Sequence, residues 1–371
     1  MLFAESPASP QSQPAESWQT AQVPQQKKTP LRPVDWFRRA DSLTNLRLPG
    51  SAPFHLKVAF HAYPGIDYAV HRQSPILNGD GVYEETWLSP ETWRREVTLG
   101  EYHAVEIRSG GRRTFHASSD YEPSRVMMLL GALLAPIPRS ILEPEINEEQ
   151  IHLKTEHLTA GAIPWVRISF RYEGKHGVPE VLAYDFLSSG ILVRREDQYS
   201  GLLTSWDDDQ LFAGKIVPRH FSVQGGGLSG PMVTASLTIE SPPLSDLAIA
   251  QVPGEPADPG STLRPIESQD MDNSGASPIH FEAPPLPSDR YPSGVETIVI
   301  AVVDREGRPR EPELGAIRNY GQSVTQQDID VVAATAQQMV TSILKDRYHP
   351  ALIDGKPCQT YWSLTMFSHP D

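Results

Sequence analysis

The chain has little of several features that mark common protein classes. It contains one cysteine, Cys358, so it can form no internal disulfide and holds no Cys-rich zinc motif. Lys and Arg number 32 against 46 Asp and Glu, and this net charge of -14 argues against a surface that follows nucleic acid. The most apolar run, at 126–137, is shorter than a membrane span and ends in prolines. We therefore expect an acidic soluble protein without a transmembrane segment.

Catalytic, metal and cofactor motifs are also missing. No GxSxG, Walker A or Rossmann glycine pattern occurs, and no histidine pair has HExxH spacing. The run Asp207 to Asp209 lacks the spaced oxygens of a calcium loop, so we interpret it as a solvated hairpin turn. The sequence predicts no metal site, no cofactor and no enzyme.

Four carboxylates lie close together in the sequence and need an explanation of their own. Paired carboxylates can act as acid and base, but on alternating strands these side chains point to different faces. We interpret them as exposed charges on a sheet, and a hydrolase would require unpaired carboxylates to converge in space. The four are Glu84, Glu85, Glu91 and Glu96.

Two polar, proline-rich segments divide the chain. Residues 1–33 are rich in Pro, Ser and Gln, which predicts a disordered tail. Residues 241–293 hold eleven prolines, eight acidic residues and two basic ones, which predicts an extended linker. The remaining segments, 34–240 and 294–371, are then two domains, each long enough to bury a core.

The 34–240 domain reads as antiparallel β structure. FHLKVAFHA at 54–62 alternates apolar and polar residues, the period of a half-buried strand. About ten such runs, separated by glycine-containing turns, predict a strongly curved sheet or barrel. Helical patterns occur at 34–43 and 124–134, and the second is apolar all round, so it must be buried.

The 294–371 domain reads as a small α+β module. A strand at 295–304 is followed by room for another near 312–320. Thr325 and Asp328 have capping-box spacing and open a helix with one apolar stripe. The closing strand carries Trp362, Leu364 and Met366 on one face.

The C-terminal part resembles the C-terminal domain of TonB-type energy transducers. The resemblance runs over VETIVIAVVDREGRPREP, a helix, and YHPALIDGKPCQTYWSLTMF, and is carried by Pro350-Ala351, Gly355-Lys356-Pro357 and Phe367. Cys358 stands where Val is common, and no membrane anchor precedes the linker. The resemblance implies a protein-docking module whose sheet edge accepts an extended peptide. It places the partner-binding edge at Trp362, Leu364 and Met366.

The N-terminal part is similar to the half-barrels of LolA/LppX-type lipoprotein carriers. The similarity lies in GDGVYEETWLSPETWRREVTLGEYHAVEIRSGGRRTF and in SWDDDQLFAGKIVPRHFSV. It implies a curved sheet around a hydrophobic cavity with a helix inside. The ligand-binding residues would then be the apolar ones of that helix, which also suit an ordinary core. These residues are Met127, Met128, Leu130, Leu133 and Leu134.

Together these features predict a non-enzymatic cell-envelope protein of the periplasm. Its half-barrel would hold an apolar ligand, a lipid or a lipoprotein, and its TonB-like module would dock an envelope or outer-membrane protein or peptide. The alternative is a protein-interaction scaffold whose half-barrel is filled by its own side chains. No nucleic-acid partner is expected, and the envelope location follows from the resemblances because the chain starts without a signal sequence.

Overall fold

The computed structural model describes fourteen segments of the chain. The predicted tail at 1–33 lies outside them except for its last three residues. The segments are 31–64, 76–142, 152–160, 163–173, 179–197, 200–227, 230–243, 255–256, 262–267, 270–273, 275–280, 291–292, 295–319 and 325–367.

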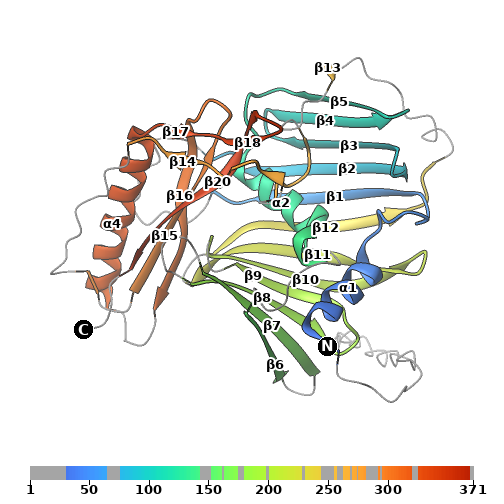
Figure 1. Ribbon diagram of the computed structural model, residues 1–371, viewed down its shortest axis with the longest axis horizontal. Helices are drawn as coiled ribbons and strands as arrows, with labels where there is room; N and C mark the ends of the chain where they lie inside the picture. Colours follow the sequence, from blue (N-terminus) through green and yellow to red (C-terminus); the bar gives the residue numbers. More distant parts are fainter. Residues whose placement is uncertain are drawn as a thin grey trace, which may run out of the picture. The chain divides into compact units, whose positions relative to one another are not determined.

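Twelve antiparallel strands form one large curved sheet that does not close. In spatial order they are β5-β4-β3-β2-β1-β12-β11-β10-β9-β8-β7-β6, so β5 and β6 lie at opposite ends (Figure 1). The predicted curved half-barrel is confirmed. The strands are β1 (Phe54–Ala62), β2 (Gly79–Ser89), β3 (Thr92–Leu99), β4 (Tyr102–Ser109), β5 (Arg112–Ala117), β6 (His152–Ala160), β7 (Ile163–Glu173), β8 (Pro179–Leu187), β9 (Leu192–Asp197), β10 (Leu202–Phe212), β11 (Lys215–Gly227) and β12 (Pro231–Glu240).

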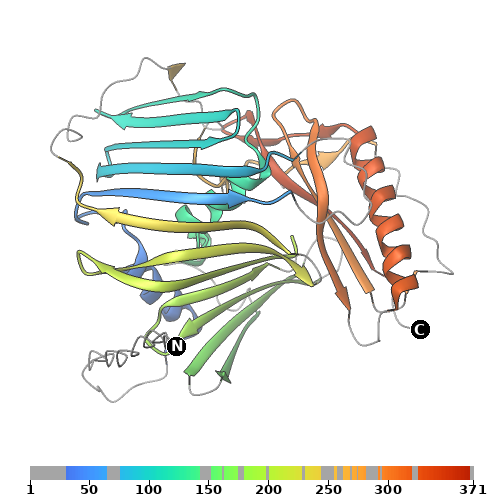
Figure 2. The ribbon, with the colours of Figure 1, turned by 180° about the vertical axis from the view of Figure 1, so that it is seen from behind.

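Helices cover one face of this sheet. α1 (Pro33–Thr44) and α2 (Ser124–Leu134) lie where the sequence predicted helices, and the short α3 (Arg139–Leu142) was not predicted. α1 and α2 lie in front of the strands in Figure 1 and behind them in Figure 2. Phe37 of α1, Leu129 of α2 and Phe54 of β1 are all fully buried in one cluster, which is the core of the half-barrel.

The stretch Ser124–Leu142 is apolar and long enough to cross a membrane by length and composition alone. It consists of two helices, because α2 ends at Leu134 and α3 starts only at Arg139. Seven of the eleven residues of α2 are buried against the protein. Its composition is therefore that of a helix packed into a core.

The interpretation of Asp207 to Asp209 as a hairpin turn is wrong. These residues lie inside β10, where Asp207 pairs with His220 and Asp209 with Pro218 of β11. The turn comes later, at Ala213 and Gly214, which both have positive φ as a two-residue hairpin turn requires. Asp208, with a φ of 52°, is the one residue of this run that is not paired, and the register of the two strands is the same on either side of it.

The C-terminal residues form the predicted small α+β unit. β15 (Val295–Val303) pairs antiparallel with β16 (Pro309–Asn319) on one side and β20 (Thr360–Phe367) on the other. α4 (Gln326–Lys345) covers one face of these strands (Figures 1 and 2). The predicted capping box is present: the Asp328 N–H donates to Thr325 Oγ1 at 3.2 Å, and the Thr325 N–H to Asp328 Oδ2 at 2.8 Å.

Five short strands follow β12 in the described part of the chain, in addition to the three long ones. β18 (Ala351–Ile353) and β19 (Lys356–Cys358) form a hairpin around the turn at Asp354 and Gly355. β14 (Ser277–Pro278) pairs with β17 (Tyr348–His349), and β13 (Glu255–Pro256) pairs with β5 of the half-barrel. Residues of the predicted linker thus add strands to both parts, and the domain boundaries stay a prediction.

The two sheets are joined by a short parallel pairing. Gly226 and Gly227 of β11 pair with Ala316 and Ile317 of β16. The approach is close, because a Cβ on Gly201 would lie 2.4 Å from the Cβ of Ala316. Gly201 also has a φ of 74°, which disfavours any other residue there.

Candidate ligand-binding site

Two cavities lie beside α2. The larger has a volume of about 730 Å³ and the smaller about 440 Å³. Ala132 and Ala135 line both, so the end of α2 forms a wall between them. Volumes of this size are typical of sites for small apolar molecules.

The five apolar residues predicted to bind a ligand have three different positions. Met127 and Met128 line the larger cavity, and Leu133 and Leu134 line the smaller. Leu130 is fully buried in the core and lines neither. A ligand-binding role for these residues stays a prediction. All of them except Leu130 line a cavity, as this role requires.

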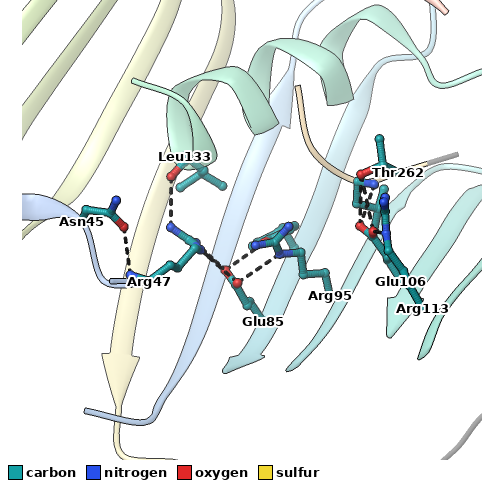
Figure 3. Close-up of polar contacts among 10 residues, drawn as sticks. Asn45, Arg47, Glu85, Arg95, Glu106, Arg113, Leu133 and Thr262 are labelled. Atoms are coloured by element: carbon teal, nitrogen blue, oxygen red, sulfur yellow. Dashed lines mark hydrogen bonds and ion pairs between the residues drawn. The ribbon is translucent and has the colours of Figure 1, made fainter. Parts of the chain in front are cut away.

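A buried ionic cluster lies on the wall of the smaller cavity (Figure 3). Glu85 of β2 accepts hydrogen bonds at 3.0 Å from Nε of Arg47, Nε of Arg95 and the hydroxyl of Tyr83. Arg47 also donates from Nη1 to the carbonyl of Leu133 at 3.4 Å, which links the cluster to α2. Burial alone would raise the pKa of Glu85, but Arg47 and Arg95 outweigh it and lower this pKa to about 2.

The interpretation of Glu85 as an exposed sheet charge is therefore wrong. Glu85 has the same strand parity as Tyr83 and Trp87, which are buried on the inner face. Its pairing partner in β3 is Arg95, which supplies the opposite charge on that face. The sequence already contained this signal, because Glu85 lies two positions after Tyr83 and two positions before Trp87 and so shares their face of the strand.

A second buried carboxylate, Glu106 of β4, holds a segment of the predicted linker. It accepts the backbone N–H of Leu263 at 2.8 Å and a hydrogen bond from the Thr262 hydroxyl at 3.4 Å, and it pairs with Arg113 (Figure 3). Leu263 is fully buried. Residues 262–267 therefore contribute to both cavities as fixed wall.

Residues of the C-terminal part hold the first turn of α2. Arg125, fully buried, forms a two-pronged ion pair with Glu313 of β16, with Nη2 and Oε2 2.7 Å apart. Pro123 at the N-cap offers no side-chain cap, and Glu311 Oε2 accepts the Ser124 N–H at 2.7 Å instead. Glu311 lies at a bulge with a φ of 49°, which directs its carboxylate out of the sheet pairing.

Two more residues of the C-terminal part bind the backbone at the start of α2. The side-chain amide of Gln359 accepts the N–H of Glu122 and donates to the carbonyl of Glu122, both at 2.8 Å. The Tyr361 hydroxyl donates to the carbonyl of Ser124 at 2.7 Å. Sequence reasoning missed this arrangement, although Arg125 is a lone charge in an apolar helix and so signals a buried partner.

The predicted partner-binding edge is the last strand of the small sheet. In the part of the chain that the structure describes, β20 pairs with β15 and with no other strand. Met366 is buried, and Trp362 and Leu364 pack on the cluster that includes α4. A docked peptide would therefore meet the backbone of β20 rather than these side chains, and partner binding at this edge stays a prediction.

One acidic group has the spacing of a metal site. Within the described residues, Asp120, Asp304 and Glu306 can bring one oxygen each within 4.8 Å of one another. Asp304 already accepts the N–H groups of Glu306 and Arg308 and the Nε of Arg310, which lies 2.8 Å from Oδ2. These hydrogen bonds within the turn between β15 and β16 explain why the carboxylate of Asp304 is buried.

Comparison with known proteins gives distant structural similarity only. No family model and no curated protein matches the chain. A LolA superfamily protein from Nitrosomonas europaea is 13% identical over 60% of this chain and 99% of its own, with a TM-score of 0.32. The Pseudomonas aeruginosa MucA/MucB complex gives 11% identity over 74% and 81%, with a TM-score of 0.24.

MucB in complex with MucA(peri) is similarly distant, at 11% identity over 86% of this chain and 100% of its own, with a TM-score of 0.27. Scores this low carry no argument about function. The fold class rests on the strand pairing of this chain itself.

Glu85 predicts a specific acid sensitivity. Its lowered pKa stabilises the folded protein above pH 4.5, and this contribution is lost as the pH falls towards 2. We expect Glu85→Gln to lower the free energy of unfolding at pH 7 by about 3 kcal/mol, and the difference from wild type to shrink below pH 4. Urea unfolding between pH 7 and 2.5 measures this, and the control is Glu84→Gln, whose side chain is 42% exposed and pairs only with the exposed Lys57. A difference that stays constant with pH would contradict it.

The ion pair between Arg125 and Glu313 predicts that the stability cost of Arg125→Met depends on whether the C-terminal part is present. In the whole chain, Arg125→Met leaves Glu313 buried without its counter-charge, and we expect a loss of about 3–5 kcal/mol. In a fragment of residues 32–240 the partner is absent, so the same substitution should cost less than about 1 kcal/mol.

The same fragment tests the predicted domain division. Unfolding followed by circular dichroism in urea should show one cooperative transition for residues 32–240. A fragment without such a transition would contradict the domain division. If Arg125→Met lowered the free energy of unfolding equally in the whole chain and in the fragment, the importance of the ion pair would be contradicted.

Proposed function

We propose that the protein is a non-enzymatic binding protein of the cell envelope, whose half-barrel holds an apolar ligand beside α2. The observation that carries this proposal is the pair of cavities, about 730 and 440 Å³, on the two sides of an apolar helix. A half-barrel filled by its own side chains would leave no such volume, so the cavities favour a ligand over the scaffold alternative.

The lining favours a molecule with a long apolar part. Met127 and Met128 offer flexible, polarizable surface to the larger cavity, and Leu133 and Leu134 offer aliphatic surface to the smaller. Lipids and acylated proteins have such a part. The envelope location, periplasmic in a bacterium, is supported by the two sequence resemblances.

The second half of the proposal is a docking role for the C-terminal unit. β20 has one strand neighbour among the described strands, so its other backbone edge can pair with an extended peptide. An envelope protein or peptide is the partner that the TonB resemblance favours. Contacts from Glu311, Glu313 and Tyr361 to the first turn of α2 would connect this unit to the cavity wall.

Gly131 gives a direct test of ligand binding. It lines the larger cavity, and a Cβ at this position would meet nothing within 4 Å. Gly131→Trp should fill the cavity, whereas Gly131→Ala adds one methyl group and should stabilise α2 by about 1 kcal/mol. We expect protein purified without detergent to carry an apolar compound, seen by native mass spectrometry and in a solvent extract, that Gly131→Ala retains and Gly131→Trp loses.

A dansyl-labelled decyl chain extends the test to protein that purifies empty. Saturable binding to wild type and Gly131→Ala, but not to Gly131→Trp, supports the proposal. If neither a copurified compound nor saturable probe binding is found in wild type, the half-barrel does not hold an apolar ligand and the scaffold alternative gains. Circular dichroism confirms that each variant is folded.

A further inference from the structure

Arg195 of β9 lines the larger cavity without a carboxylate partner. Within the described part of the chain its guanidinium makes one hydrogen bond, from Nη1 to the carbonyl of Ala135 at 3.2 Å. Most of its N–H donors therefore have no acceptor in the protein. Other arginines on the cavity walls do pair with carboxylates, namely Arg47, Arg95, Arg139 and Arg264.

The strand register places Arg195 on the inner face of the half-barrel. Arg195 pairs with Tyr184 of β8 and with Thr204 of β10, and paired residues of antiparallel strands project to the same face. Tyr184 is fully buried in the core, and Thr204 lines the larger cavity. Arg195 is half-buried, so part of its side chain is accessible from the cavity that it lines.

One face of α2 leads along the cavity to this arginine. The face consists of Met128, Gly131, Ala132 and Ala135, which all line the larger cavity and have the spacing of neighbours on one helix face. Its two ends are about 10 Å apart along the helix axis. A Cβ on Gly131 would meet nothing within 4 Å, so there is open space along this face. The apolar face therefore ends where the carbonyl of Ala135 holds a cation.

The carboxyl groups of the larger cavity leave the charge of Arg195 uncompensated. Asp197 lies two residues along the same strand face, but it accepts the N–H and the hydroxyl of Ser200, at 3.3 and 2.8 Å. No ion pair joins Asp197 to Arg195 among the described residues. The other carboxyl groups either pair with different arginines or precede α2 at its opposite end. They are Asp120 and Glu267, which are paired, and Glu122, which precedes the helix.

We infer that the larger cavity binds a free fatty acid, with its carboxylate on the guanidinium of Arg195 and its chain along this face of α2. The inference rests on the proposed function and specifies its ligand. A carboxylate that leaves water needs a counter-charge, and an arginine stays charged at every pH at which the protein is folded. The guanidinium also presents parallel N–H groups that match the two oxygens of a carboxylate.

Other head groups fit this position less well. A neutral head group would leave the guanidinium without a counter-charge, and an ammonium group would be repelled by it. A phosphate monoester brings nearly two negative charges to one arginine and places them near Asp197. The expected order of affinity for one chain length is therefore carboxylate first, then phosphate, then alcohol, with the amine last.

Four ten-carbon probes test this order in a displacement assay with the dansyl-labelled decyl chain. They are decanoate, decyl phosphate, decanol and decylamine, all measured at pH 8, where the carboxylate is ionised and the amine is cationic. We expect wild-type protein to bind decanoate about tenfold or more tightly than decanol, the range of one hydrogen bond to a charged group.

The ratio of decanoate to decanol affinity distinguishes an anchor from a structural residue. Losing the bond between Arg195 and Ala135 would weaken both probes alike, whereas losing the charge weakens decanoate alone. Arg195→Met should bring the ratio to about one, and Arg195→Lys, which keeps the charge, should retain most of it. The exposed Arg112→Gln lies outside both cavities and should behave as wild type.

Each result has a definite reading. Equal affinity for decanoate and decanol in wild type, or a preference that Arg195→Met keeps, overturns the anchor role. Decyl phosphate binding more tightly than decanoate replaces the fatty acid by a phosphate-bearing lipid and also overturns the inference. If Arg195→Met does not fold by circular dichroism, the comparison in wild type and in Arg195→Gln decides.

Failure of the inference differs from failure of the proposed function. Saturable binding of decanol without any preference for decanoate leaves the half-barrel a binding protein and removes only the fatty-acid carboxylate. If none of the four probes and no dansyl-labelled chain binds to wild type or to Gly131→Ala, the proposed function itself fails.

Discussion

The buried charge of Arg125 is the constraint on which the rest of the arrangement depends. An arginine in the first turn of an apolar helix cannot stay buried alone, and Glu313, from the distant strand β16, supplies its counter-charge. Glu311, two residues earlier in the same strand, takes the place of the missing N-cap side chain. The position of α2, and with it the wall between the two cavities, is thus set by the C-terminal part of the chain.

The pKa values of two glutamates shift in opposite directions within this one protein. Two arginines lower the pKa of Glu85 to about 2, whereas burial and the charge of Glu106 raise the pKa of Glu122 to about 8. Burial raises the pKa of both carboxyls, so burial alone does not explain the opposite shifts. The sign of the neighbouring charges decides whether the pKa of such a carboxyl falls or rises.

Local periodicity was enough to predict much of the fold. The alternation in β1, the all-apolar character of α2 and the capping box before α4 each depend on neighbours within a few residues. The errors arose where long-range pairing overrides local character: the run Asp207 to Asp209 continues β10 because β11 pairs with its first and last residues. The site was predicted only as one apolar helix, because which face meets which cavity depends on strands far away in the sequence.

The separation between Arg125 and Glu313 along the chain has a consequence for biosynthesis. The two residues are 188 positions apart. At common translation rates a ribosome needs roughly 10–40 s to make that stretch. During this interval the half-barrel strands can already pair, while the helix that divides its interior still lacks both its counter-charge and its cap. A newly made chain therefore passes through a stage in which the strands are complete and the binding chamber is unfinished, and that stage ends only when β16 leaves the ribosome.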